Sequence, residues 1–154
     1  MRESFASRGG WWVVGQTSLM VAVVLLGALQ PGPWSSRISG ALGGAFMAMA
    51  GTLGIWGARA LGRNTTAFPK PREGGALVQN GPYAIVRHPL YSSVILGSLG
   101  WGLMVASIPS LAATAVLTAF LNAKAAREER WLRATYPDYD AYARRVRRLV
   151  PYVL

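Results

Sequence analysis

Four long runs of residues with at most one charge dominate this sequence, at residues 11–29, 40–60, 89–107 and 109–123. Roughly 20 consecutive apolar residues cross a bilayer as a helix, because a helix satisfies its backbone hydrogen bonds internally. The first three runs reach that length, and the fourth reaches it if the helix continues into water. The sequence therefore predicts an all-α, polytopic membrane protein with four transmembrane helices, at residues 11–29, 40–60, 89–107 and 109–127.

The composition agrees with a membrane protein and argues against several other classes. Hydrophobic residues make up 52% and charged residues 14% of the 154 residues, whereas a soluble domain averages about 25% charged residues. The net charge of +10 does not indicate nucleic-acid binding, because the basic residues stand in blocks between apolar runs. With no cysteine and one histidine, neither a disulfide framework nor a tetrahedral zinc site is predicted. We expect one domain, residues 1–154, that binds no nucleic acid and no metal.

The basic residues also predict how the helices are oriented. They precede the first run and fill the connection between the second and third, whereas the other two connections carry only Arg37. By the positive-inside rule, both termini, the loop at residues 62–88 and the tail at residues 128–154 face the cytoplasm, and the chain forms two helical hairpins. A cleaved signal peptide is not predicted at residues 11–29, because the run is too long and no A-x-A-like cleavage site follows it.

In two of the predicted helices, glycines leave one face without bulky side chains. Small residues let helix backbones approach closely in lipid. We therefore expect these glycines to pack helices together, within a monomer or across a homodimer, and assign them no chemistry. They are Gly40, Gly44, Gly51, Gly54 and Gly57 in the second run and Gly97 and Gly100 in the third.

The polar residues that can do chemistry lie in the loop and the tail. The loop is rich in proline, glycine and asparagine, which favours turns over a regular element, and its apolar residues argue against disorder. The tail interleaves tyrosines with arginines. That pattern predicts a short C-terminal interfacial helix, with aromatic rings at headgroup depth and arginines on anionic membrane lipids.

His88, the one histidine of the chain, stands between Arg87 and Pro89 at the start of the third run. Proline is favoured at the first helical position, so we expect Pro89 there and His88 at the cap. The free N–H groups of a helix start, the Arg87 cation and Tyr91 on the same side of the first turn predict a binding corner for an anionic group. The alternative is structural: Arg87 and Tyr91 anchor a helix end at the membrane interface, and His88 is a hydrogen-bonded loop residue.

Two of the six acidic residues, Glu128 and Glu129, are adjacent where the fourth helix leaves the membrane. Lys124 lies one turn before Glu128, so these two side chains can meet on one face, while Glu129 is turned about 100° away. Adjacent carboxylates can bind the hydroxyls or the amino group of a ligand. The alternative is a solvated helix surface on which Arg127 and Arg130 neutralise the acids.

The loop and tail clusters together, in this order, resemble the isoprenylcysteine carboxyl methyltransferase family, which includes phospholipid methyltransferases. R-H-P-x-Y followed, after a helical hairpin, by E-E-x-x-L and Y-x-x-Y is far more specific than R-H-P-x-Y alone. The resemblance covers the last half of the chain, and the first two predicted helices match only in being apolar. The residues that carry it are Leu77, Val78, Gly81, Pro82, Tyr83, Arg87, His88, Pro89, Leu90, Tyr91, Glu128, Glu129, Leu132, Tyr136, Pro137, Tyr139, Tyr142 and Pro151.

The resemblance implies a small integral membrane enzyme that transfers the methyl group of S-adenosylmethionine to a lipophilic, membrane-resident acceptor. It implies that the loop segment before Gly81, the turn at His88 and the first acid, Glu128, hold this cofactor. The implied cofactor-binding residues are Gly75, Ala76, Leu77, Val78, Tyr83, His88, Pro89, Leu90, Tyr91, Glu128 and Glu129, with Lys124 and Arg87 at the substrate.

Two positions depart from the family pattern and leave the acceptor open. The prenylcysteine enzymes typically have arginine where this chain has Lys124, and lysine lacks the bidentate fork that grips a carboxylate. Arg147 stands where many members have proline. The sequence therefore does not say whether a carboxylate, an amine, a hydroxyl or a thiol is methylated. An amine or phenol acceptor needs a base near neutral pH, and His88 is the candidate for that catalytic role.

The sequence leaves two other functions open. A membrane reductase of the sterol type resembles this family in its C-terminal region and binds NADPH, but such proteins are usually longer and carry more polar residues within their helices. A non-enzymatic membrane protein would bind anionic lipid or a partner through its cytoplasmic arginines. Lipid binding alone requires neither a histidine-proline cap nor paired acids.

Overall fold

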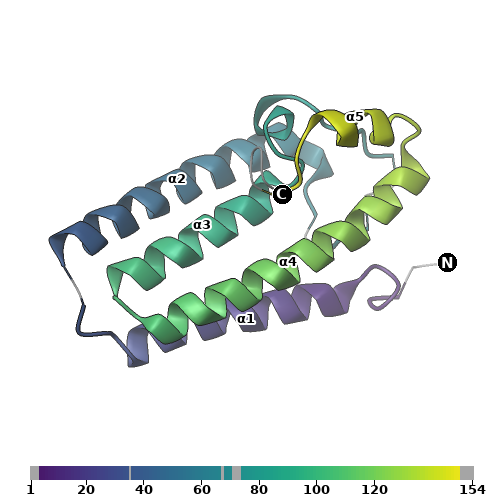
Figure 1. Cartoon of the computed structure of the whole chain (residues 1–154). Helices are drawn as coiled ribbons and strands as arrows, with labels where there is room; N and C mark the ends of the chain where they lie inside the picture. Colours follow the sequence, from purple (N-terminus) through teal and green to yellow (C-terminus); the bar gives the residue numbers. More distant parts are fainter. Residues whose placement is uncertain (1–3, 35, 67, 71–73, 150–154) are drawn as a thin grey trace.

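The computed structural model describes residues 4–34, 36–66, 68–70 and 74–149. Every long element of regular secondary structure within them is a helix (Figure 1). These residues contain no strand, and a single parallel bridge joins Val86 to Arg147. Pro151, which contributes to the family resemblance, lies outside them. The all-helical prediction is confirmed. The helices are α1 (Gly10–Leu29), α2 (Arg37–Leu61), α3 (Pro89–Met104), α4 (Ile108–Thr135) and α5 (Tyr139–Arg145), with short 3-10 helices η1 (Gly62–Asn64) and η2 (Gly81–Ala84).

Local sequence explains where three of the four long helices begin. At the start of α2, the Ser36 hydroxyl accepts the Ser39 N–H and the Ser39 hydroxyl accepts the Ser36 N–H, a reciprocal capping box. The Ser107 hydroxyl caps α4 by accepting a backbone N–H one turn later. His88 is the cap of α3 and Pro89 its first residue, as predicted, because proline lacks the N–H that would be unpaired there.

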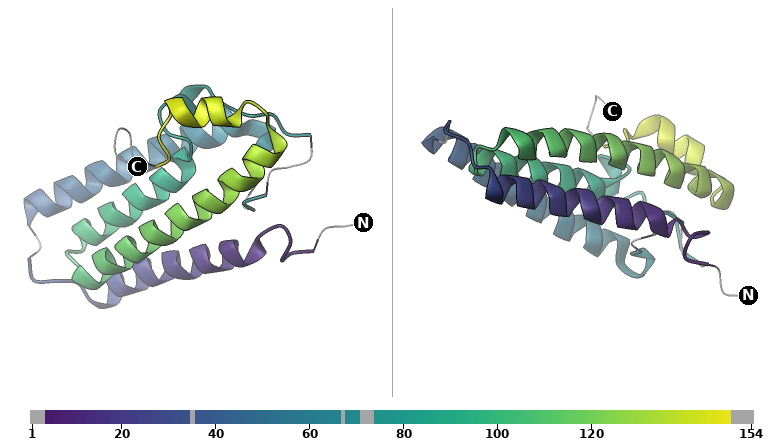
Figure 2. Two further views of the ribbon diagram at one scale, coloured as in Figure 1. Left: turned by 45° about the vertical axis from the view of Figure 1, so that its right-hand side comes forward. Right: turned by 90° about the horizontal axis from the view of Figure 1, so that it is seen from below.

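The four long helices lie side by side in the order α2, α3, α4, α1 (Figures 1 and 2). α2 packs on α3, α3 on α4, and α1 mainly on α4. The predicted hairpin of α3 and α4 is therefore present. The other predicted hairpin is not, because within the described residues α1 and α2 are joined in sequence but lie on opposite sides of the central pair.

Glycine brings the backbones of α2 and α3 together. A methyl group added at Gly43 would come within 2.6 Å of Gly100 O, and one at Gly100 within 2.7 Å of Gly43 O. Gly43, at the tightest point of this seam, was not among the glycines predicted to pack helices. The predicted packing role is confirmed for Gly54, Gly57, Gly97 and Gly100. A methyl group added at Gly40, Gly44 or Gly51 would meet nothing within 4 Å, so these three glycines pack against no helix within the described part of the chain.

Gly43→Ala is expected to destabilise the protein by about 1–3 kcal/mol, the usual effect of overpacking a tight interface. The added methyl group would press on backbone atoms of α3, which cannot move aside as the end of a flexible side chain can. Gly44→Ala is the matched control, because a methyl group there meets nothing within 4 Å. Thermal unfolding in detergent measures the difference in stability between the two variants. Equal melting temperatures would contradict the close packing of α2 on α3 at Gly43.

Within the described residues, three helices are long and apolar enough to cross a membrane: α1, α4, and α2 extended through η1 to Asn64. The third predicted span is shorter than expected, because α3 has 16 residues and ends at Met104 instead of residue 107. The chain turns there, with Ala106 at a left-handed φ of 53° and Ser107 already serving as the cap of α4. At 1.5 Å per residue α3 covers about 24 Å, less than the roughly 30 Å of a hydrocarbon core. Helix length therefore supports three spans and does not confirm the fourth.

The loop and the tail fold against each other at one end of the bundle (Figure 1). Apart from two short 3-10 helices, the described part of the loop is irregular, as its composition predicts. The Arg87 N–H donates to Arg147 O at 2.8 Å, and the His88 N–H donates to Arg148 O at 3.0 Å. These bonds tie the tail to the turn that starts α3.

The tail contains the predicted short helix, α5, but its tyrosines do not face the headgroups. Tyr139 and Tyr142 are buried and pack with Leu77 of the loop and Leu132 of α4. Their rings turn inward because the tail is bonded back onto the loop. The tail therefore forms one wall of a pocket.

Candidate active site

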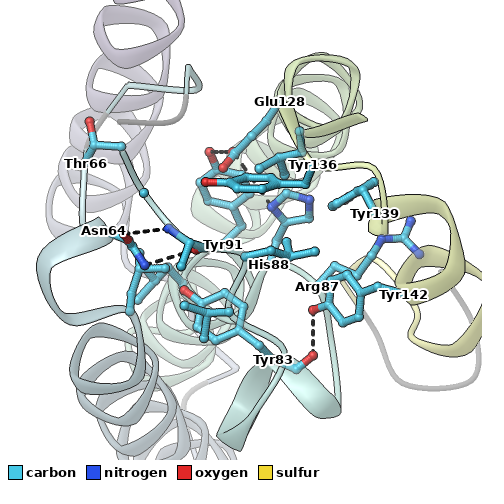
Figure 3. A pocket seen from close by; sticks show the side chains of 17 residues that line it. Asn64, Thr66, Tyr83, Arg87, His88, Tyr91, Glu128, Tyr136, Tyr139 and Tyr142 are labelled. Carbon is cyan, nitrogen blue, oxygen red and sulfur yellow. Dashed lines mark hydrogen bonds and ion pairs between the residues drawn. The ribbon is translucent and has the colours of Figure 1, made fainter. Parts of the chain in front are cut away.

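A pocket lies where the loop, the start of α3, the end of α4 and the tail meet (Figure 3). It contains about 810 Å³ of empty space, its open side included. Its walls combine tyrosine rings and aliphatic side chains with a few polar groups. The lining residues are Leu61, Asn64, Thr66, Gly75, Ala76, Leu77, Val78, Tyr83, Arg87, His88, Leu90, Tyr91, Glu128, Leu132, Tyr136, Tyr139 and Tyr142.

His88 is held between the two acids of α4. Its ring stacks on Tyr91, with ring centroids 5.3 Å apart and an interplanar angle of 3°. Nδ1 lies 3.8 Å from Glu128 Oε2, and Nε2 lies 3.4 Å from Glu129 Oε1. Both ring nitrogens therefore face carboxylates, and the cap of α3 is joined to the end of α4.

Glu128 is the carboxylate that lines the pocket. Its side chain is 24% exposed, and the Tyr91 hydroxyl donates to Oε2 at 2.6 Å. A hydrogen bond this short to an ionised acceptor is of the strong, charge-assisted kind. The bond fixes the direction of the carboxylate while part of it stays accessible to a ligand.

Glu129, by contrast, is fully buried behind the pocket. Its Oε1 accepts from Arg87 Nε at 3.0 Å and from Arg148 Nε at 2.9 Å, and its Oε2 accepts from Arg148 Nη2 at 3.0 Å. Arg87 Nη1 also donates to the backbone carbonyls of Ala143 and Val146. Glu129 is therefore not on a solvated helix surface, because its closest arginine partners come from the loop and the tail.

Lys124 lies against Tyr91 but outside the pocket lining. Its side chain is almost wholly buried, and Nζ donates to Gln16 Oε1 of α1 at 2.6 Å. Nζ also lies 5.1 Å from the centroid of the Tyr91 ring, a cation–π contact. The described residues include no ion pair between Lys124 and Glu128, so the predicted meeting of these side chains is not observed. Lys124 instead connects α1 to Tyr91, whose hydroxyl orients Glu128.

Three tyrosines from the loop and α5 form one side of the pocket. The Tyr142 hydroxyl donates to Tyr83 O at 2.6 Å and so ties α5 to η2. Burial raises the pKa of Tyr142 to about 12, and burial likewise raises the pKa values of Tyr83 and Tyr139, so all three stay protonated near neutral pH. The Tyr139 hydroxyl is buried and has no hydrogen-bond partner within the described residues. Such an unpaired buried group is rare, and this one belongs to a residue that lines the pocket.

Asn64 holds the loop segment that forms another wall. Its Nδ2 donates to Ala76 O at 3.1 Å, and its Oδ1 accepts the Ala76 N–H at 3.3 Å. This pair of bonds fixes an irregular segment where no regular element is present to do so. Asn64 was not predicted as a site residue, because an asparagine in a turn-rich loop gives no local signal of a partner 12 residues away.

The structure brings together most of the residues that the sequence singled out. Of these, Pro89, Lys124 and Glu129 are buried outside the pocket lining. Four further residues were not predicted as site residues, although the Y-x-x-Y spacing was a signal for two of them: Tyr136, Tyr139, Tyr142 and Arg148. In the part of the chain described here, no three His, Cys, Asp or Glu side chains are grouped so as to hold a metal ion. The singled-out residues that line the pocket are Gly75, Ala76, Leu77, Val78, Tyr83, Arg87, His88, Leu90, Tyr91 and Glu128.

Comparison with known sequences identifies the family of this chain. The phospholipid methyltransferase family matches residues 38–139, a stretch that contains the turn at His88 and both acids. The chain belongs to the phospholipid methyltransferase family. As a member whose described residues include three helices long and apolar enough to cross a membrane, it is an integral membrane protein. α1 lies outside the matched stretch.

Two curated relatives carry names that refer to metal resistance. The cobalt-zinc-cadmium resistance protein CzcN of Cupriavidus metallidurans is 30% identical over 145 residues, which cover 94% of this chain and 63% of the relative. The nickel-cobalt-cadmium resistance protein NccN of Alcaligenes xylosoxydans xylosoxydans is 30% identical over 152 residues, covering 97% of this chain and 68% of the relative. This chain therefore spans about two thirds of the length of these relatives. No solved structure matches it.

Proposed function

We propose that this phospholipid methyltransferase family member transfers the methyl group of S-adenosylmethionine to a lipophilic acceptor held in the membrane. The observation that carries the proposal is the Glu128 carboxylate, which is partly exposed in a tyrosine-walled pocket and oriented by Tyr91. Membership of the family supports it. The pocket lies at the end of the bundle, where a water-soluble cofactor can meet an acceptor that stays in the membrane.

The residues of the pocket fit S-adenosylmethionine by their chemistry. Tyrosine and leucine side chains offer flat apolar walls for an adenine ring. Glu128 is an acceptor for ribose hydroxyls or for the ammonium group of the methionine part. The unpaired Tyr139 hydroxyl is a further group that a bound ligand would satisfy. We propose as cofactor contacts Gly75, Ala76, Leu77, Val78, Tyr83, His88, Leu90, Tyr91 and Glu128.

The side chains next to these contacts act mainly by holding them in place. When bound, the cofactor supplies a methyl group already activated on a sulfonium, so alignment is the main task of the protein. Because both ring nitrogens of His88 face carboxylates, we propose that His88 positions the site first and serves as a base second. Arg87 and Glu129 bind each other, and in this proposal they steady the loop and the tail and do not contact the acceptor.

We propose that the pocket end of the bundle faces the cytoplasm, together with both termini. The loop and the tail at this end carry most of the arginines, whereas the connections at the other end carry only Arg37. In this arrangement α3 makes a fourth crossing although it has 16 residues, because it runs antiparallel between α2 and α4. Tilt and local thinning of the bilayer accommodate short helices of this kind.

A metal-binding role is not carried over from the names of the two relatives, because metal-holding clusters are lacking in the residues that the structure describes. The two other functions left open by the sequence are an NADPH-dependent reductase and a lipid-binding protein without activity. They predict different ligands for the same pocket. Measuring which ligand binds therefore distinguishes the methyltransferase from the reductase and from the lipid-binding protein.

The test is calorimetric titration of the detergent-purified protein with S-adenosylhomocysteine and, separately, with NADPH. We expect saturable binding of S-adenosylhomocysteine alone, and transfer of tritiated methyl groups from S-adenosylmethionine into the lipid extract of added membranes. Saturable binding of NADPH instead would replace the methyltransferase with a reductase. If the folded protein bound neither ligand, both enzymatic functions would be refuted, and lipid binding by the arginines would be favoured.

A further inference from the structure

A second cavity lies between α1, α2 and α3, away from the ends of the bundle. It contains about 630 Å³ of empty space, its open side included. Its lining is apolar apart from one serine, and it includes Met20 and Val24 of α1, Met47 of α2, and Val94, Gly97 and Trp101 of α3.

The arrangement of the helices explains why this space is not filled. α1 and α2 both contact α3 but are not packed on each other in the described part of the chain, so a groove runs over α3 between them. Gly97 supplies no side chain to fill it. Val24 and Met47, on the two sides of the groove, are themselves substantially exposed, so the open side faces the lipid.

The cavity and the active-site pocket are lined by successive turns of the same helix, α3. Leu90 and Tyr91, in the first turn of this helix, line the active-site pocket. Val94 is four residues after Leu90 and Trp101 seven residues after Val94, spacings that keep side chains on one face. At 1.5 Å per residue the stripe reaches about 16 Å from the active-site pocket into the membrane.

The facing side of α1 changes from polar to apolar in the same direction. Gln16 lies at the level of the active site and accepts a hydrogen bond from Lys124, which in turn contacts Tyr91. Met20 and Val24, one and two turns further along α1, line the cavity. The Lys124 ammonium is buried and has no ion pair within the described residues. One polar end next to Tyr91 and an apolar groove leading away from it match the shape and chemistry of a membrane amphiphile.

We propose that this cavity holds the hydrocarbon chain of the methyl acceptor, with its polar head at the level of Gln16, Lys124 and Tyr91. The inference rests on the proposed methyl transfer and adds to it the acceptor class, an amphiphile whose hydrocarbon chain lies along α3. It also assigns α1, which the family match does not cover, a wall of the acceptor site.

The test uses photoactivatable palmitic acid, with a diazirine in the middle of its chain, on the purified protein in lipid nanodiscs. We expect saturable labelling, displaced by unlabelled palmitic acid, on peptides that contain Met20, Val24 or Met47. Val24→Phe narrows the groove and is expected to weaken this labelling about tenfold, since displacing two methylene groups from an apolar site has an effect of that size. Met47→Phe, which narrows the groove from α2, is expected to act in the same direction.

Val21→Phe is the matched control on the same helix. Val21 and Val24 are 51% and 52% exposed, but only Val24 lines the cavity. Equal labelling of the Val21 and Val24 variants, or labelling that never saturates, would mean ordinary contact with bulk lipid and would overturn the proposal. S-adenosylhomocysteine binding is measured on every sample. Its loss from the wild-type protein would refute the proposed methyl transfer, whereas its retention in Val24→Phe with weakened labelling supports a separate chain site.

Discussion

Glu129→Gln is expected to lower the free energy of unfolding by about 3–5 kcal/mol, the usual effect of removing one partner from a buried ion pair. Glu129 is fully buried and accepts hydrogen bonds from Arg87 and Arg148. The neutral amide keeps the shape of the side chain but removes the charge. Two guanidinium groups would then be left partly buried without the negative charge that they share, and the link between the tail and α4 through Arg148 would weaken. Thermal unfolding in detergent, followed by circular dichroism, measures the effect.

Asp140→Asn is the control for this experiment. Asp140 also pairs with an arginine, Arg133, but its side chain is 63% exposed. Exposed ion pairs contribute about 0–1 kcal/mol, so this variant is expected to melt close to the wild-type protein. If Glu129→Gln melted together with Asp140→Asn, the buried network would have no structural importance.

The same network shows how far the sequence could predict the site. The adjacent acids and the histidine-proline turn could be singled out because each is a local pattern. The family resemblance implied that Glu128 holds the cofactor, but no local pattern shows which of the two adjacent acids faces the pocket. It is decided by Arg148, 19 residues away in the tail, which binds Glu129 and leaves Glu128 to the pocket.

The fold shows the same division between local and long-range information. The apolar runs predicted the long helices because the period and length of a span are local properties. The end of α3 depends on the turn at Ala106, and the seam at Gly43 depends on which face of α2 meets α3. Asn64 is a similar case, because its partner Ala76 is brought near only by the folded loop. Features of this kind depend on contacts between residues that are distant in the sequence, and a local sequence pattern does not show those contacts.

Glu128→Gln is expected to have the opposite outcome to Glu129→Gln: normal stability and weak cofactor binding. The Glu128 side chain is partly exposed, and the Tyr91 hydroxyl can donate to an amide oxygen as it does to the carboxylate. A hydrogen bond to a charged group contributes about 1.5–3 kcal/mol. We therefore expect the affinity for S-adenosylhomocysteine to fall roughly 10- to 150-fold, as measured by calorimetric titration, while the melting temperature stays near that of the wild-type protein.

Tyr91→Phe separates the charge of Glu128 from its orientation. This variant keeps the carboxylate and the stacked ring but removes the hydroxyl that donates to Oε2. Because the charge that binds the ligand remains and only the group that orients it is lost, the loss of affinity is expected to be several-fold and smaller than in Glu128→Gln. An unchanged affinity in Glu128→Gln, in a protein that binds S-adenosylhomocysteine, would mean that the ligand lies elsewhere. Weak binding in Glu128→Gln with normal stability, beside low stability in Glu129→Gln, would mean that two neighbouring acids on one helix serve separate purposes, one holding the ligand and the other the fold.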